Sequence, residues 1–334
     1  MNKLGAGVLG LGVGAQHADG YARLSGCEVV ALCDRSEEKL NSVRSKYWSA
    51  TATTHWRDMI ADERIHIISI ASADDDHADQ AVAALEADKN VFVEKPMCRS
   101  EEELCGIKDA LDRHTHLHLA SNLVLRASPI YRWLRESIRR GDLGEIYALD
   151  GDYLYGRIQK ITDGWRKDVE NYSVMQGGGV HLIDLMLWLT GQRPTDVISQ
   201  GNRICTRGTA FRQCDFMAST FSFPSGMVGR ITANFGCVHR HQHVLKVFGT
   251  KGTFLLDDCG PRIHYSRNSD SIAEPVDLAV LPSAKWDLIP EFVGGILAGD
   301  PQMQSNKQEF DLMAACLAAD KALKECRTVE VEYL

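Results

Sequence analysis

The sequence has no pair of cysteines in a C-x-x-C arrangement, no strongly basic run and no apolar segment long enough to span a membrane. Its ten cysteines are scattered without regular spacing, which in a chain of this length indicates reduced, mostly buried thiols. With a net charge of −8, the chain lacks the clustered Lys/Arg surface that nucleic-acid binding requires. We therefore expect a cytoplasmic protein whose partners include neither nucleic acid nor a membrane.

Two regions of different pattern divide the 334 residues, a length that favours two domains. In the first region, short strand patterns alternate with helical patterns, clearest at 77–90 and 100–114, where apolar residues recur every three or four positions. In the second, a helix at about 128–140 precedes longer strand patterns such as 227–235, where apolar or small residues alternate with polar ones. The predicted strands of the first region are 4–9, 28–33, 65–71, 91–93 and 116–120.

These patterns predict an α/β protein, since repeated β-α-β units form a parallel, doubly wound sheet. The N-terminal domain, over 1–121, is expected to be a Rossmann domain. The C-terminal domain, over 122–334, is expected to be α+β, built on a large, mostly antiparallel sheet. We expect that sheet to form the interface of a homodimer or homotetramer.

A glycine-rich turn follows the first predicted strand. Its sequence Gly10-Leu-Gly12-Val-Gly14-Ala15 fits G-x-G-x-x-A, in which the first glycine permits a tight turn and the second lets the backbone approach a pyrophosphate. Asp34 ends the second predicted strand, where a carboxylate binds the adenosine ribose and favours NAD, while Arg35 would tolerate the 2′-phosphate of NADP. A turn without a ligand is the alternative, but the strand–turn–helix context favours a dinucleotide. The predicted cofactor-binding residues here are Gly10, Gly12, Val13, Gly14, Ala15, Asp34 and Arg35.

A second group of polar residues lies in MQGGGVHLIDLMLWLTG (175–191), on a helix predicted to be buried. From 182 to 189 every side chain is apolar except that of Asp184. His181 and Asp184 are three positions apart and share one face of the helix. Such groups cost free energy in a core unless they are paired or used. A core histidine that caps its own helix is the alternative, but the three preceding glycines, which let another group approach the backbone, favour a functional site.

The stretch VFVEKPM (91–97) brings Glu94 and Lys95 to the end of a predicted buried strand. Ligands of doubly wound sheets bind beyond the carboxyl ends of the strands, so we expect this pair to face a ligand. A surface ion pair is the alternative interpretation.

Together, E-K-P after an apolar strand, the preceding IASADDDHADQAVAALEADKN and the later GGGVHLIDLMLWLTG resemble the Gfo/Idh/MocA family of NAD(P)-dependent sugar oxidoreductases. The likeness covers nearly the whole chain, through RASP (126–129) and GWRKD (164–168) to VFGTKGTFLL. It implies a dehydrogenase that transfers a hydride between NAD, or NADP, and a secondary alcohol of a sugar or sugar derivative, nucleotide-linked and amino sugars included. It also implies that Lys95 reaches the nicotinamide and the substrate oxygen, that Glu94 helps to hold the cofactor ribose, and that the Lys95–Pro96 bond is cis.

The family often carries an aspartate four residues before this histidine, where the present chain has Gly177. We favour His181 as the group that takes the hydroxyl proton while the Lys95 ammonium stabilises negative charge on the oxygen; the reverse assignment stays open. Asp184, the third catalytic candidate, either orients His181 or pairs with another helix. Two alternatives to a dehydrogenase remain: a glycosidase or epimerase that uses transient oxidation, and a sugar or dinucleotide sensor without turnover.

The resemblance implies further contacts in both domains. Ser72, Asp74 and His77 are expected to contact the cofactor, and the expected substrate-binding residues are Lys95, Asn122, Arg126, Tyr153, Trp165, Arg166 and His181. Two histidine clusters, HTHLH (114–118) and HRHQH (239–243), place histidines two apart, as on one face of a strand. No carboxylate or cysteine is spaced to complete a metal site. We therefore expect no metal, a packing role for the first cluster and a substrate loop at the second.

Overall fold

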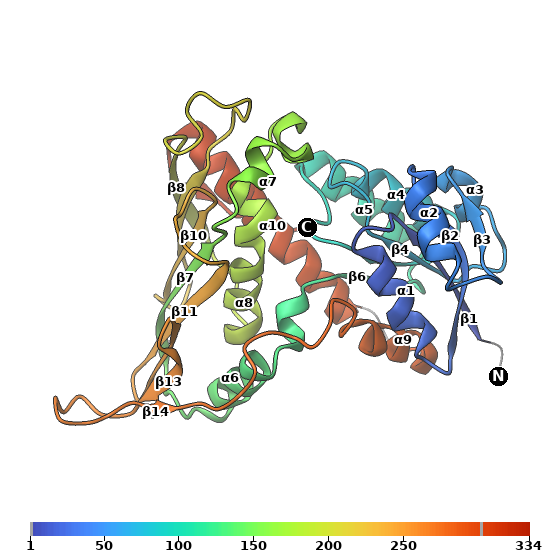
Figure 1. Cartoon of the computed structure of the whole chain (residues 1–334). Helices are drawn as coiled ribbons and strands as arrows, with labels where there is room; N and C mark the ends of the chain where they lie inside the picture. The colour runs from blue at the N-terminus through green and yellow to red at the C-terminus, as the bar shows by residue number, and fades with distance from the viewer. Residues whose placement is uncertain (1–2, 301–302) are drawn as a thin grey trace. The chain divides into compact units, whose positions relative to one another are not determined.

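The computed structural model describes residues 3–300 and 303–334, apart from the side chains of 303–305. The chain forms two units, each with its own sheet (Figure 1). Met1–Val124 and Pro282–Met313 make up the first unit together with Leu334, and Leu125–Leu281 and Ala314–Tyr333 make up the second. This division differs from a single cut after residue 121, because the chain returns to the first unit after residue 281. No described helix is long and apolar enough to cross a membrane.

The sheet of the first unit has six parallel strands in the order β3-β2-β1-β4-β5-β6. The strands are β1 (Leu4–Leu9), β2 (Cys27–Cys33), β3 (Thr51–Thr53), β4 (Ile67–Ile70), β5 (Asn90–Val93) and β6 (Leu119–Ser121). The helices are α1 (Gly14–Ala22), α2 (Glu37–Arg44), α3 (Trp56–Ile60), α4 (His77–Glu86) and α5 (Glu101–Arg113). The strand order proceeds outward from β1 and β4 in opposite directions, which confirms the doubly wound sheet and creates a switch point at their carboxyl ends.

Several boundaries differ from the sequence-based expectation. The strand predicted over 116–120 begins only at Leu119, so the HTHLH cluster precedes the strand and its histidines do not line a strand face. The segments α2, β3 and α3 were not predicted, because they are short or mostly polar and carry little apolar periodicity.

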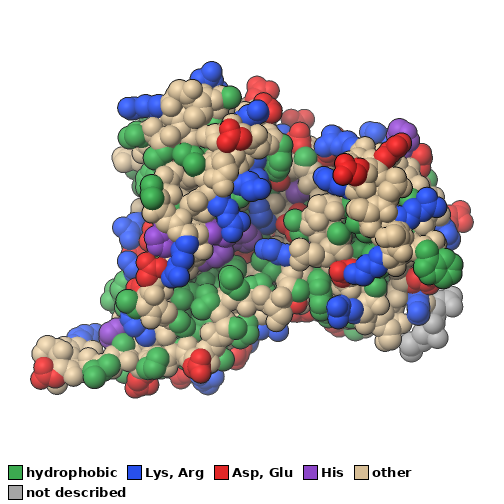
Figure 2. Space-filling model, viewed as in Figure 1, with side chains coloured by type: hydrophobic (Ala, Val, Ile, Leu, Met, Phe, Trp, Pro, Cys, Tyr) green, Lys and Arg blue, Asp and Glu red, His purple; other side chains and the backbone are tan. Residues whose placement is uncertain are grey.

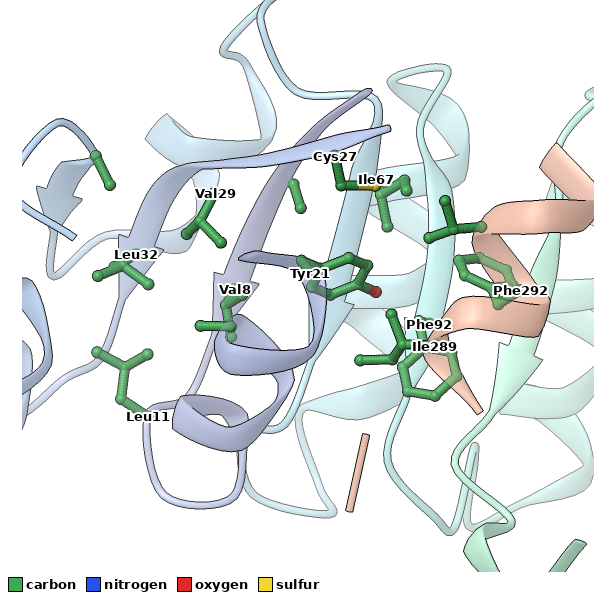
Figure 3. Packing of buried hydrophobic residues seen from close by; sticks show 14 of the residues in the cluster. Val8, Leu11, Tyr21, Cys27, Val29, Leu32, Ile67, Phe92, Ile289 and Phe292 are labelled. Carbon is green, nitrogen blue, oxygen red and sulfur yellow. The ribbon is translucent and has the colours of Figure 1, made fainter. Parts of the chain in front are cut away.

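The core of the first unit lies between the sheet and the helices that cover it. Tyr21 of α1 and Phe92 of β5 are completely buried there, and Ile289 and Phe292 of α9 (Ile289–Ala298) pack into the same cluster (Figure 3). Each large apolar side chain buried in this way contributes about 1.5–3 kcal/mol relative to an exposed one. This burial explains why the later segment belongs to the first unit.

The second unit contains a nine-stranded sheet in the order β14-β13-β12-β11-β7-β10-β9-β8-β15. All neighbours are antiparallel except β7 and β10, which confirms a mostly antiparallel sheet. Its strands are β7 (Ile146–Leu154), β8 (Asp196–Asn202), β9 (Phe216–Ser222), β10 (Val228–Asn234), β11 (Gln242–Gly249), β12 (Thr253–Asp257), β13 (Gly260–His264), β14 (Glu274–Pro275) and β15 (Val329–Glu330). The other elements are η1 (Val124–Ala127), α6 (Pro129–Arg140), α7 (Gln159–Thr162), η2 (Trp165–Asp168), the π-helix η3 (Met175–Gly179), α8 (Val180–Thr190) and α10 (Met303–Glu325), which both units share.

Helix α8 lies along one face of this sheet (Figure 1). Glycines of the sheet make room for it, because a Cβ on Gly151 of β7 would lie 3.2 Å from Leu182 and one on Gly229 of β10 would lie 2.2 Å from Met186. The close packing explains why the helix is apolar on almost every side. It also fixes the position of the polar residues that α8 carries.

Candidate active site

The glycine turn after β1 is held in place by Asp34. Gly10 has a φ of 80°, and a Cβ there would lie 2.3 Å from the carbonyl oxygen of Ala71, so the turn requires glycine. The two carboxylate oxygens of Asp34 accept hydrogen bonds from the backbone nitrogens of Leu11 (2.7 Å) and Ser36 (2.8 Å). Asp34 therefore ties the turn to the end of β2, in addition to the ribose contact predicted for it.

The start of α1 has room for an anion. A Cβ on Gly12 would meet nothing within 4 Å, whereas one on Gly14 would lie 2.9 Å from Val8. Gly12 thus leaves space above the turn, and Gly14 lets the helix pack closely on the sheet. No side chain caps the helix at Val13, which is exposed. Because the first N–H groups of a helix have no partner within it, these residues fit the pyrophosphate of a dinucleotide.

The other side chains that were predicted to contact the cofactor mainly contact groups of the protein itself. Ser72 donates its hydroxyl hydrogen to Gln80 (2.7 Å), and the Nδ1–H of His77 donates to the carbonyl oxygen of Pro96 (2.7 Å). His77 therefore supports the turn that carries Lys95. Asp74 is buried, and exposed Arg35 pairs with Asp76 at 3.4 Å.

The Glu94 carboxylate, at the carboxyl end of β5, lies in a polar network. His17 of α1 contacts it through Nε2 (3.2 Å) and contacts Ser69 through Nδ1 (3.0 Å). Asn122 donates to Glu94 (2.7 Å) and to the carbonyl oxygen of Lys285 (2.8 Å). These contacts place Asn122, predicted to bind substrate, as a support of Glu94 within the first unit.

This network keeps Glu94 ionised. Burial alone would raise the pKa of Glu94, but the hydrogen bond and charge of His17, the charge of Lys95 and the Asn122 amide outweigh it and lower this pKa to about 2. The Lys95–Pro96 bond is cis, as the family resemblance implied. Sequence reasoning missed His17, whose signal was a histidine on the buried face of the first helix.

In the second unit, Asp184 of α8 pairs with Arg126 of η1. The Arg126 Nε lies 3.0 and 3.1 Å from the two carboxylate oxygens, and one terminal nitrogen lies 2.5 Å from the first. Burial raises the pKa of Asp184, and the Arg126 guanidinium opposes that rise. The geometry thus matches a structural ion pair, with both predicted site residues engaged by each other.

Aromatic and histidine rings gather around Tyr153 of β7. His181 stacks on it with ring centroids 6.3 Å apart and an interplanar angle of 24°, and His243 lies edge-on at 5.2 Å. His243 of β11 is directly opposite Tyr153 in the sheet register and edge-on to His181 at 5.8 Å. His241 lies 5.2 Å and Tyr155 lies 5.8 Å from Tyr153. His241 and His243 were expected only as part of a substrate loop; the alternating histidines of HRHQH were the available signal.

The three glycines before His181 accommodate side chains of the protein itself. A Cβ on Gly177 would lie 2.1 Å from the Tyr172 hydroxyl, and one on Gly178 would lie 2.3 Å from the Tyr153 ring. Arg166 of η2 donates from Nε to the Tyr172 hydroxyl oxygen at 3.1 Å. Trp165, a predicted sugar contact, is 43% exposed, and the Arg166 guanidinium lies over its ring at 4.5 Å. The expected close approach therefore exists, and the approaching groups are two tyrosines.

Asp320 of α10 anchors the π-helix η3 that leads into α8. Its carboxylate accepts hydrogen bonds from Ser173 Oγ (2.6 Å) and Gln176 Nε2 (2.7 Å). Ser173 Oγ in turn accepts from the backbone nitrogens of Met175 and Gln176. Burial of the carboxyl group raises the pKa of Asp320 to about 6, although both side-chain hydrogen bonds act against the rise.

The histidine clusters do not form a metal centre in the part of the chain that the structure describes. No group of three or more His, Cys, Asp and Glu side chains there is arranged to hold a metal ion. His116 contacts Asp88 at 2.7 Å, and His239 contacts Asp258 at 3.1 Å, so these histidines form surface pairs with single carboxylates.

Comparisons with known proteins match both units. A family model described as "Oxidoreductase family, NAD-binding Rossmann fold" matches residues 4–121, and the model of the "GFO/IDH/MocA C-terminal domain" matches residues 131–255. The chain is 22% identical to a myo-inositol 2-dehydrogenase of Thermotoga maritima over 98% of each chain. It is 27% identical to a levoglucosan dehydrogenase of Pseudarthrobacter phenanthrenivorans over 58% of this chain and 52% of that protein. A solved levoglucosan dehydrogenase in complex with NADH has the same fold, with a TM-score of 0.85 at 20% identity over 100% of both chains.

The glycine run generates a prediction for Gly178. In Gly178→Ala the added methyl group collides with the Tyr153 ring, so we expect the free energy of unfolding to fall by about 1–3 kcal/mol in urea titrations. Gly294→Ala in α9 is the matched control, because its Cβ would meet nothing within 4 Å. This control should keep or gain stability, by up to about 1 kcal/mol. Equal stability of the Gly178 variant and the wild type would contradict the packing role.

The raised pKa of Asp320 predicts a pH dependence of stability. The folded carboxyl titrates near pH 6 instead of near its ordinary value of 3.8. Between these two pH values the folded state therefore binds more protons than the unfolded state. The free energy of unfolding should therefore fall as pH rises from below 4 to above 6, by on the order of 3 kcal/mol in total. Asp320→Asn lacks this titration, and the stability difference between the two proteins, measured by urea unfolding from pH 4 to 8, should level off above pH 7. A difference that stays constant, or that grows in favour of the wild type with rising pH, would refute this linkage.

Proposed function

Because this chain belongs to the Gfo/Idh/MocA family of NAD-binding oxidoreductases, we propose that it transfers a hydride between NAD and a secondary alcohol of a sugar or cyclitol. The observation that carries the proposal is the turn at the end of β5. There an ionised Glu94 is fixed by His17 and Asn122, next to Lys95. The names of the relatives, dehydrogenases of myo-inositol and levoglucosan, support a polyol or sugar substrate.

We assign the binding of the cofactor to residues of the first unit. The turn at Gly12 and the start of α1 would hold the pyrophosphate, Asp34 the adenosine ribose and Glu94 the second ribose. When bound, NAD accepts the hydride. Glu94 would accept hydrogen bonds from ribose hydroxyls, since it is ionised at neutral pH.

We assign the loss of the hydroxyl proton, and the stabilisation of the charge that it leaves on the oxygen, to His181 and Lys95. As the C–H hydride leaves the substrate, its hydroxyl must lose a proton, which His181 takes at a ring nitrogen. The Lys95 ammonium stabilises the negative charge that develops on the oxygen. Tyr153 positions the His181 imidazole by stacking on it, and the Asp184–Arg126 pair fixes the helix one turn further on.

The central test measures NADH formation from NAD with a panel of free sugars, cyclitols, amino sugars and nucleotide-linked sugars. With the best substrate, Lys95→Met and His181→Ala should each lower kcat by about 10²–10⁴-fold, while calorimetry shows NAD still bound. Lys108→Met and His116→Ala are matched controls, because these side chains pair with Asp112 and Asp88 on the surface. Wild-type rates in the Lys95 or His181 variant would refute the assigned roles. Binding of NAD without reduction by any substrate would favour cleavage or epimerisation without net redox, or a sensor.

Two further expectations remain proposals. We propose a homo-oligomer formed through the outer face of the nine-stranded sheet, because Ile198 and Val228 are exposed there among polar residues. Sedimentation velocity should show a dimer or tetramer that the double variant Ile198→Glu/Val228→Glu dissociates; a monomeric wild type would exclude it.

We also propose a cytoplasmic location, which cell fractionation tests, because none of the ten cysteines forms a disulfide.

A further inference from the structure

The first unit contains a cavity of about 670 Å³ at the carboxyl ends of β2 and β3. These two strand ends lie side by side, because β2 and β3 are parallel and Cys33 is opposite Thr53. The cavity is lined by Arg35, Thr54, His55, Trp56, Arg57 and Asp58. Asp34, which is proposed to hold the adenosine ribose, directly precedes Arg35, so the cavity adjoins the position of that ribose.

Arg57, in the first turn of α3, is an exposed cation that lines this cavity. Its guanidinium carbon lies over the Trp56 ring, 4.2 Å from the ring centre. This contact with an aromatic face restrains the plane of the guanidinium group and leaves the N–H bonds at its edge available to a ligand. In the part of the chain that the structure describes, no carboxylate pairs with Arg57. The cavity therefore presents an oriented positive charge beside the ribose position.

Arg35 supplies a second guanidinium group to the same cavity. It pairs with Asp76 at 3.4 Å, and the two side chains are 79% and 37% exposed. An exposed ion pair of this length contributes little free energy, so it leaves Arg35 able to bind an anion in the cavity. Among the described residues that line the cavity, the only carboxylate is that of Asp58. Two arginines against one aspartate give this lining an excess of positive charge.

The neighbouring carboxylate of Asp34 is partly compensated by the backbone. Its two oxygens accept hydrogen bonds from the nitrogens of Leu11 (2.7 Å) and Ser36 (2.8 Å), and such bonds stabilise the charge of a carboxylate. On the visible surface of the first unit, Lys and Arg side chains are interspersed with Asp and Glu side chains (Figure 2). No broad field of one sign covers the part of this surface that the structure describes, so the residues that line the cavity decide which ligand it prefers.

We propose that this chain binds NADP as well as NAD, and that Arg57, together with Arg35, holds the 2′-phosphate that distinguishes the two cofactors. With the adenosine ribose against Asp34, its 2′-oxygen would lie at the edge of the cavity. Arginine suits this task, since its planar fork matches phosphate oxygens with two hydrogen bonds. A cavity of this size also has room for the adenine ring. The inference rests on the proposed function and extends it to the choice of cofactor.

The test measures binding of NAD and NADP to the full-length protein by calorimetry, without a sugar. The Kd of NADP should lie within about tenfold of the Kd of NAD. Arg57→Gln should raise the Kd of NADP by at least about tenfold and leave that of NAD within about threefold; Arg35→Gln should act in the same direction. Rising salt should weaken NADP binding more than NAD binding. Arg64→Gln is the matched control, because this exposed arginine precedes β4, at the opposite end of the strands, and pairs with Asp62. It should change neither Kd.

Because binding is measured without a sugar, the inference and the proposed hydride transfer can fail separately. If NADP binds with the expected dependence on Arg57 but no substrate reduces either cofactor, hydride transfer fails and the inference is supported. If a substrate reduces NAD while NADP binds more than about tenfold more weakly than NAD, the proposed function stands and the inference is overturned. An equal loss of affinity for both cofactors in Arg57→Gln also overturns it, since Arg57 would then contact the part that NAD and NADP share. Binding of neither cofactor would contradict both proposals.

Discussion

The ionised carboxylate of Glu94 is the constraint around which the first unit is arranged. Taking a carboxylate out of water without a partner costs on the order of several kcal/mol, yet this chain places one at the end of a buried strand. The cost is offset by groups from distant segments: His17 of α1, the adjacent Lys95, and Asn122 after β6, which is itself fixed by the Lys285 carbonyl 163 positions away. The return of the chain after residue 281 is therefore part of the site's support as well as part of the core.

In the second unit, the corresponding constraint is the lack of side chains at 177–179. The run of glycines lets the Tyr172 hydroxyl and the Tyr153 ring reach the backbone of η3. An α-helix tolerates three consecutive glycines poorly, because each loses more backbone entropy than alanine. The segment forms a π-helix, held at its start by Asp320 through Ser173 and Gln176. The glycines thus let two phenols approach the backbone of η3, and one of them, Tyr153, stacks on His181.

The parts of this structure that depend on local pattern could be predicted from the sequence. The first strand was predicted with its observed bounds, Leu4–Leu9, and the buried helix with His181 and Asp184 was also predicted. The partners of these residues could not be, because they depend on register and on chain reversal. Arg126 pairs with Asp184, 58 positions away, and His243 lies opposite Tyr153 in the sheet register. Both contacts follow from how strands and helices pack, and neither leaves a periodic signal in the sequence. His17 was missed although it lies on the buried face of the first helix, because its partners Ser69 and Glu94 come from other strands.

Hydride transfer from an alcohol, the reaction proposed for this chain, places a requirement on the charges near the reacting oxygen. Negative charge develops on the oxygen, so a carboxylate close to it would oppose the reaction unless that carboxylate served as the base. In the first unit Glu94 has Lys95 beside it, and in the second unit Asp184 pairs with Arg126. Among the described residues, Tyr153 stacks on His181 and His243 lies edge-on to it, so rings without a formal negative charge lie beside the proposed base.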